Sequence, residues 1–190
     1  MRLKTLWLLL FCLVTALSLS SILSHAAESP MAASANIGNG VGKFRFELHK
    51  LGKGKYERFN EVDAEIKVFK NESTEVFQRI KTIIGIESPA FDFIDINGDG
   101  YVDMLLYNAC AGYADCSGPS TGADVFVYAP QLGKFVKSKT LSGKGNITTS
   151  KKKGCVNVNY KCSDQDYIDE EWCFNLSTGK WKMIKQAGCN

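Results

Sequence analysis

The sequence predicts an all-β protein, arranged mainly as an antiparallel sandwich or an incomplete, propeller-like domain. Short stretches such as Phe44–Leu48 alternate apolar and polar residues, which is the period of a half-buried strand. Two later hairpins, at residues 124–137 and 171–183, share the order apolar strand, short turn and Gly-Lys-aromatic, a weak repeat of about 50 residues. No stretch alternates strand and helix patterns, so a parallel sheet is not expected.

Residues 1–26 are expected to be a secretory signal peptide. The positive residues Arg2 and Lys4 precede the apolar run Leu6–Leu19, which is too short to span a bilayer comfortably, and small residues predict cleavage after Ala26. Cleavage would remove two positive charges and lower the net charge from +3 to +1, which does not favour nucleic-acid binding. No second apolar run approaches membrane length. We therefore expect an exported protein, periplasmic or extracellular, that does not span a membrane.

Residues 27–42 are small, Gly/Asn-rich and unpatterned, and we interpret them as a flexible leader. A single β domain is expected over residues 43–190. Residues 74–86 fit either a helix or a strand, and the β-branched run Thr82–Ile84 favours a strand. The other predicted strands are residues 44–48, 64–69, 91–94, 102–107, 124–128, 133–137, 155–160, 168–175 and 179–183.

Six cysteines remain after the signal peptide, and an even number in an exported chain predicts up to three disulfides in an oxidising compartment. One pair follows from a hairpin register. If Val156 lies opposite Trp172, then Cys155 lies opposite Cys173 on the other face, where the two can bridge. A further pair would close a small loop and leave a third pair over; these are Cys110–Cys116 and Cys162–Cys189.

The strongest local motif is the run from Asp95 to Asp103, DINGDGYVD, between two predicted strands. Its oxygen-bearing side chains fall at alternate positions of a tight loop, and Gly100 permits the sharp turn. A hard cation such as Ca²⁺ takes six to eight oxygen ligands. The predicted ligands are Asp95, Asn97, Asp99, the carbonyl of Tyr101, and Asp103. The alternative is an Asp/Gly-rich turn without a metal.

A long small-residue segment, 108–124, follows the strand after this loop. A loop that is held at both ends loses little entropy on binding. Its candidate contact residues are one aromatic side chain and several slim hydrogen-bonding residues: Tyr113, Ser117, Gly118, Ser120 and Thr121. The alternative is a loop that only connects two strands.

Candidate catalytic residues are few. His49 is the one histidine after the signal peptide, which leaves little for zinc binding or for Ser–His chemistry. An acidic cluster, residues 164–171, could steer a basic partner or supply paired carboxylates for glycoside cleavage, although no spacing identifies an acid and a base. We expect a protein that is not an enzyme.

The motif Asp-x-Asn-x-Asp-Gly-x-x-Asp resembles the calcium loop of FG-GAP/VCBS-type repeats. The longer run FDFIDINGDGYVDMLL, the Ser/Gly loop and VFVYAPQLGKFVKSKTLS resemble a group of exported bacterial proteins. That group includes immunity proteins against peptidoglycan hydrolases, and it is similar to periplasmic inhibitors of invertebrate-type lysozyme. The resemblance covers roughly residues 90–142.

The resemblance implies a calcium site at the five residues above. It also implies that a Ser-Gly loop, here Ser117-Gly118 or Ser120-Thr121-Gly122, enters the cleft of a hydrolase. The first hypothesis is therefore a calcium-binding inhibitor or immunity protein whose partner is a peptidoglycan hydrolase or lysozyme. The second is a calcium-stabilised module that binds a glycan or a protein, and the third is a secreted glycosidase.

Overall fold

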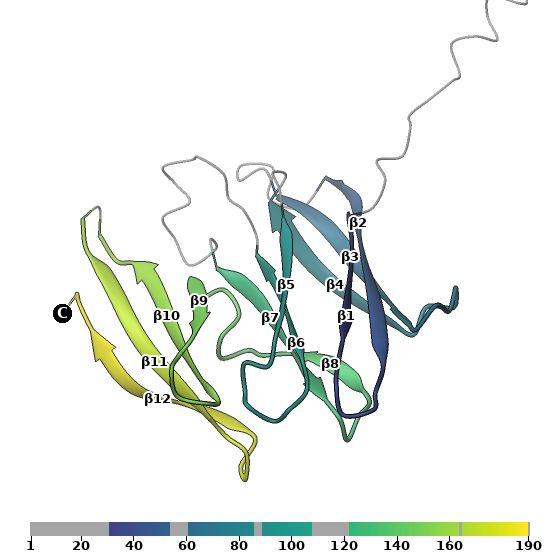
Figure 1. Cartoon of the computed structure of the whole chain (residues 1–190). Coiled ribbons are helices and arrows are strands. Elements are labelled where there is room, and N and C mark those ends of the chain that lie inside the picture. Colours follow the sequence, from purple (N-terminus) through teal and green to yellow (C-terminus); the bar gives the residue numbers. More distant parts are fainter. Residues whose placement is uncertain (1–30, 54–60, 86–88, 108–121, 164, 190) are drawn as a thin grey trace, which may run out of the picture.

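The computed structural model describes residues 31–53, 61–85, 89–107, 122–163 and 165–189. Within these residues the chain has no helix and forms three antiparallel sheets of four strands each, which confirms the predicted all-β class. The sheets succeed one another along the chain and across the molecule (Figure 1). Each sheet is a meander in chain order, which is the organisation of a propeller blade.

The strands of the three sheets have the following bounds. The first sheet contains β1 (Met31–Asn36), β2 (Lys43–Lys53), β3 (Glu61–Lys70) and β4 (Gln78–Gly85). The middle sheet contains β5 (Ala90–Ile94), β6 (Asp103–Tyr107), β7 (Ala123–Ala129) and β8 (Lys134–Lys137). The last sheet contains β9 (Asn146–Thr149), β10 (Cys155–Lys161), β11 (Tyr167–Asn175) and β12 (Lys180–Ala187).

The middle sheet is buried on both faces. Met104 and Leu106 of β6 belong to a core that includes Phe46 of the first sheet. Leu105, between them, belongs to a second core that includes Val156 of the last sheet. Because successive side chains of a strand point to opposite faces, β6 supplies both cores in turn. Fully burying one such side chain contributes roughly 1.5–3 kcal/mol, so the two cores hold the three sheets together.

The first and middle sheets are also joined by polar contacts to β8 and β7. The Gln78 side-chain amide donates from Nε2 to the carbonyl oxygen of Phe135 (2.8 Å), and the Phe135 N–H donates to Gln78 Oε1 (3.0 Å). The hydroxyl of Thr82 donates to Asp124 Oδ2 over 2.7 Å in a buried position. Gln78 thus pairs with an edge strand as a neighbouring strand would.

The interpretation of residues 27–42 as a flexible leader is wrong for the part that the structure describes. Met31–Asn36 form β1, which pairs with β2 in an antiparallel register, and Ile37 is fully buried. The residues of β1 alternate between half-buried and exposed. Four of its six residues are Ala or Ser, so this alternation is hardly visible in hydropathy. Strand β9 was not predicted either.

The predicted hairpin register between β10 and β11 is confirmed. Val156 pairs with Trp172, and Cys155 pairs with Cys173. A disulfide joins Cys155 to Cys173, and a second joins Cys162 to Cys189. Cys110 and Cys116 lie outside the described residues. The ambiguous segment 74–86 contains β4, as favoured.

The two disulfides lie near the C-terminal end of the chain, and their presence agrees with an exported protein. In the part of the chain that the structure describes, no helix is long and apolar enough to cross a membrane. The predicted signal peptide, residues 1–26, lies outside that part.

Candidate metal loop and partner segment

The predicted metal loop connects β5 to β6 and winds around the carboxylate of Asp95. Asp95 Oδ1 accepts hydrogen bonds from the backbone N–H groups of Gly98 (2.8 Å) and Asp99 (3.1 Å). Asp95 Oδ2 accepts one from Gly100 (2.9 Å), and Asp99 Oδ1 accepts one from the N–H of Tyr101 (2.9 Å). Short polar side chains that bind backbone N–H groups a few residues ahead favour such turns.

Asp103 is the innermost carboxylate of this loop and is fully buried. It accepts hydrogen bonds from the N–H groups of Tyr128 (2.8 Å, to Oδ1) and Ile96 (3.1 Å, to Oδ2). The pKa of Asp103 is raised to about 8, first by burial and also by the nearby charges of Asp99 and Asp95, while the two N–H bonds oppose the shift. None of the ion pairs between described residues includes any of these three aspartates.

The donor set of the loop fits Ca²⁺ in kind. Three carboxylates and the amide of Asn97 are oxygen ligands of the type that a hard cation prefers, and the buried carboxylate of Asp103 would gain from a compensating positive charge. In the structure, side-chain oxygens of Asp95, Asn97 and Asp99 accept hydrogen bonds from the loop backbone. Asn97, for example, accepts from the Asp99 N–H (3.0 Å) and donates to Asp99 Oδ2 (2.9 Å).

The three aspartates are not gathered into one tight group of ligand atoms. Among the described residues, the one group of three Asp, Glu, His or Cys ligand atoms within 4.8 Å of one another is Cys155, Glu171 and Cys173. Two of its members form a disulfide, so it is not a calcium site. In this arrangement the carboxylates of the loop would have to draw together to coordinate one ion.

The metal loop lies where turns of all three sheets meet. In the turn between β1 and β2, Asn39 Nδ2 donates to the Gly100 carbonyl (2.9 Å), and the carbonyl of Ile37 accepts from the Val102 N–H (3.0 Å). On the other side, the loop packs against the turn before β10. A Cβ atom on Gly98 would lie 2.9 Å from the Cα of Gly154, so only glycine fits there without a shift.

The predicted partner segment leaves the middle sheet between two anchored residues. Tyr107 and Ala123 are direct cross-strand neighbours at the ends of β6 and β7. The Tyr107 hydroxyl donates to the carbonyl of Ile147 in β9 (2.9 Å), and the Ala123 N–H donates to the Gly145 carbonyl (3.3 Å). The ends of the segment are thereby tied to β9 and to the residue just before it.

The structure describes one of the six predicted contact residues. Gly122 is buried, and a Cβ atom on it would lie 2.4 Å from the Gly145 nitrogen, so it packs in the fold and does not offer a contact surface. The other predicted contacts lie outside the described residues, as does the predicted disulfide Cys110–Cys116. They are Tyr113, Ser117, Gly118, Ser120 and Thr121.

The acidic cluster does not act as one group. Glu170 is buried and receives hydrogen bonds from Trp172 Nε1 (2.6 Å), Tyr160 Oη (2.8 Å) and Lys144 Nζ (3.1 Å). Burial alone would raise the pKa of Glu170, but these donors outweigh it and lower the pKa below its usual value. Asp169 is exposed and accepts from Asn159 Nδ2 (2.7 Å).

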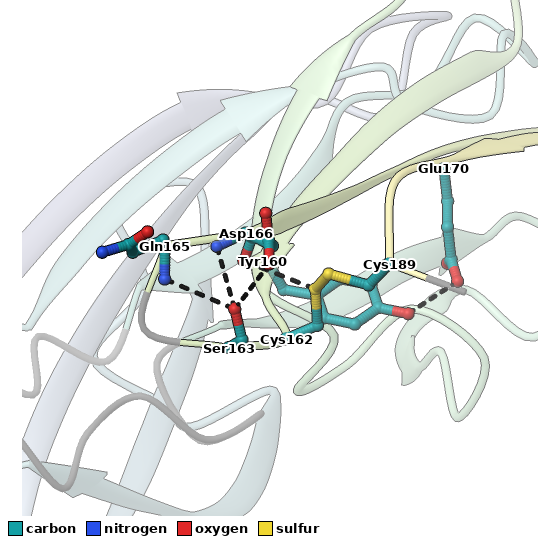
Figure 2. The surroundings of a disulfide bond; sticks show 7 residues. All are labelled: Tyr160, Cys162, Ser163, Gln165, Asp166, Glu170 and Cys189. Atoms are coloured by element: carbon teal, nitrogen blue, oxygen red, sulfur yellow. Dashed lines mark hydrogen bonds between the residues drawn. A yellow bond between two sulfur atoms is a disulfide. The ribbon is translucent and has the colours of Figure 1, made fainter.

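The network around Glu170 was not predicted from the sequence. Figure 2 shows the Tyr160–Glu170 hydrogen bond beside the Cys162–Cys189 disulfide. In the next turn, Ser163 accepts from the N–H of Asp166 (3.1 Å). A satisfied, buried carboxylate of this kind stabilises the last sheet and is not arranged as an acid or base for glycoside cleavage.

His49 lies within β2. Its Nε2 is 3.1 Å from Glu47 Oε2, and burial, followed by the charge of Lys67, lowers the pKa of His49.

Comparison with known proteins finds a similar fold but identifies no family. No protein-family model and no curated protein matches the chain. A solved structure described as "Structure of a Xanthomonas Type IV Secretion System related protein" matches with a TM-score of 0.53 and 11% sequence identity. The match covers 87% of this chain and 85% of that chain. At this identity the similarity shows a shared fold alone.

Proposed function

We propose that this protein is an exported, calcium-binding inhibitor or immunity protein that blocks the active-site cleft of a peptidoglycan hydrolase of the lysozyme type. The inserted element is the segment between Tyr107 and Ala123. The observation that carries the proposal is the anchoring of this segment: its two ends are cross-strand neighbours, and they are hydrogen-bonded to β9 and to the residue just before it.

Anchored ends matter because binding orders whatever is free to move. Immobilising side chains and loops at an interface costs roughly 0.5–1.5 kcal/mol for each flexible side chain. A segment whose ends are already fixed has less freedom to lose. Slim hydroxyl and backbone groups, such as those of residues 117–121, can hydrogen-bond the carboxylates that line a glycan-cleaving cleft.

The metal loop supports this proposal through β6. Asp103 is the first residue of β6, and its carboxylate binds the N–H of Tyr128 in β7. The strand pair that carries the partner segment is therefore tied to the loop at its other end. A calcium ion there would hold the strand pair in place and would take no part in chemistry. An inhibitor of this kind needs no catalytic residue of its own. Export would bring the protein to the compartment in which cell-wall hydrolases act.

The test is peptidoglycan hydrolysis by animal-, invertebrate- and phage-type lysozymes, with and without the protein that begins at residue 27. The protein is used with its disulfides intact and in calcium. We expect one class to be slowed, with saturation near one inhibitor per enzyme. The triple variant Ser117→Ala, Ser120→Ala, Thr121→Ala should weaken inhibition at least tenfold. Gly122 is left unchanged because any side chain there would disturb the fold.

The matched control is Ser73→Ala, which removes a hydroxyl from the exposed turn between β3 and β4 and should leave inhibition unchanged. Folded, calcium-loaded protein that slows no hydrolase would sink the proposal. Capture of insoluble peptidoglycan without an effect on its hydrolysis would favour a glycan-binding module instead. Hydrolysis by the protein alone, lost on changing a single Asp or Glu, would favour a glycosidase.

A further inference from the structure

A groove opens where the middle and last sheets diverge. It has a volume of about 530 Å³ and lies between β7 and β8 on one side and the turn between β11 and β12 on the other. Residues 138–140, which follow β8, also line it. The groove contacts Val127 and Ala129, at the end of β7 opposite to Ala123.

The floor of the groove is apolar and continues the second core. Phe174 and Trp181 are cross-strand neighbours whose ring centroids are 5.1 Å apart, and Trp181 and Val127 pack against that core. Two further apolar lining residues are open to solvent: Leu132 is 59% exposed and Val136 is 41% exposed. Exposed apolar residues around a groove of this size are typical of a surface that receives an apolar group.

The groove is also positively charged. Lys137, Lys139 and Lys180 line it, and among its described lining residues there is no Asp or Glu. Lys137 Nζ is 2.8 Å from Asp124 Oδ1, so its charge is largely balanced. The ion pairs between described residues include neither Lys139 nor Lys180. Two lysine charges near an apolar floor complement an anion that carries an apolar group.

We propose that this groove binds an acidic segment of a partner protein, with one apolar side chain of that segment seated on Phe174 and Trp181. A saccharide fits the groove less well. Sugar hydroxyls need several acceptors, whereas the uncharged polar side chains in the lining are those of Gln131, Ser138 and Thr140. The volume suits one large side chain with its neighbours, which is the size of a peptide anchor.

The test uses a fluorescein-labelled peptide, Asp-Glu-Asp-Trp-Asp-Glu-Asp, and fluorescence anisotropy with the full mature protein. We expect saturable binding that weakens as salt is raised, because exposed charges are screened. The double variant Lys139→Glu, Lys180→Glu should weaken binding at least tenfold. The matched control, Lys151→Glu, Lys152→Glu, makes the same change of charge on exposed residues outside the groove and should bind as the unchanged protein does.

A second variant tests the apolar anchor. Leu132→Ser removes an exposed side chain that the fold does not need, and it should weaken the Trp peptide several-fold. It should have little effect on a peptide with Gly in place of Trp, which should bind weakly in any case. Equal binding by the groove variant and its control would overturn the proposal. So would displacement of the peptide by chitohexaose, which would make the groove a saccharide site, or peptide-induced dimerisation with no dependence on Lys139 and Lys180.

Neither result bears on the inhibitory segment. Inhibition of a hydrolase without peptide binding would support the proposed function and overturn this inference. Peptide binding without inhibition would support this inference and overturn the proposed function.

Discussion

Asp103 is a fully buried carboxylate, and the ion pairs between described residues do not include it. In the metal-free protein its pKa is raised to about 8 from an ordinary value of 3.8. The folded protein therefore holds a proton that the unfolded chain releases between these two values. Its contribution to stability is complete below about pH 4 and is lost as the pH rises through about 8.

We accordingly expect the metal-free protein in EDTA to lose stability between pH 5 and pH 8. Calcium should reverse this trend, because it favours the ionised carboxylate and so binds more tightly at the higher pH. Thermal unfolding at each pH, with EDTA or with calcium, measures both. Asp103→Asn should flatten the dependence. A metal-free protein that became more stable over this range would contradict the assignment.

Glu170 differs from Asp103 because protein donors surround it. Glu170→Gln should lower the free energy of unfolding by about 1–3 kcal/mol, since the partly buried Lys144 loses its carboxylate partner. Its neighbour Asp169 is exposed, so Asp169→Asn should stay within about 0.5 kcal/mol of the unchanged protein. Urea denaturation of both variants checks this. Equal free energies of unfolding for the two variants would mean that the hydrogen-bond network around Glu170 adds nothing to stability.

Because the pKa of Glu170 is lowered, the contribution of Glu170 to stability should be present above pH 4.5 and should fall only in more acidic solution.

At the scale of elements, most strands could be predicted because their apolar residues are large and alternate. The β10–β11 register followed from two pairs, Val156–Trp172 and Cys155–Cys173. The same register places Glu170 on the same face of β11 as Trp172. From the sequence, this was the one indication that Glu170 would be buried. Strand β1 could not be recognised, because the Ala and Ser residues that fill it bury little apolar area and mask the alternation.

Strand β1 gives a direct test of that correction. Removing residues 27–36 should lower the free energy of unfolding by about 2 kcal/mol or more, because β2 loses an edge partner and the half-buried Met31 leaves the core. Removing residues 27–30 alone leaves β1 in place and is the control. The comparison is made by urea denaturation. If both deletions had the same small effect, β1 would be dispensable to the fold.

The two observed disulfides should stabilise the protein similarly but affect the metal loop differently. They close loops of sequence separation 18 and 27, for which chain entropy suggests about 3 kcal/mol each. Cys155 follows Gly154, which packs against Gly98 of the metal loop. Replacing Cys155 and Cys173 with Ala should therefore also weaken calcium binding, whereas replacing Cys162 and Cys189 should not. Calorimetric titration with calcium distinguishes the two pairs, and equal affinities would show that the Gly154 turn does not support the loop.

For the whole molecule, the metal loop is the place where the three sheets share contacts. The sequence predicted the loop as a local motif, since its spacing is local. It could not predict that Asn39 and Gly154, both far away in the chain, would close on it, because those contacts exist only once the sheets have assembled.

Gly154→Ala should therefore act on the whole fold. At φ +72°, an added Cβ would lie 2.8 Å from the carbonyl oxygen of Asn97. We expect a loss of more than about 2 kcal/mol together with weaker calcium binding. The control, Gly133→Ala, has a similar φ of +62° but open space around it, so it should show only the backbone strain of about 1 kcal/mol. Unfolding and calcium titration of both variants measure the difference, and equal losses would mean that the close packing at Gly154 has no effect.

The amide of Gln78 has a consequence for how the protein behaves at high concentration. An edge strand with open peptide groups is a template on which another chain can add and start a fibril. At Phe135 of β8 that template is already occupied, because a side chain of the same molecule plays the part of the missing peptide group. We therefore expect Gln78 to oppose the addition of another strand at this point of β8. A lysine there could repel a neighbouring chain but could not occupy both peptide groups.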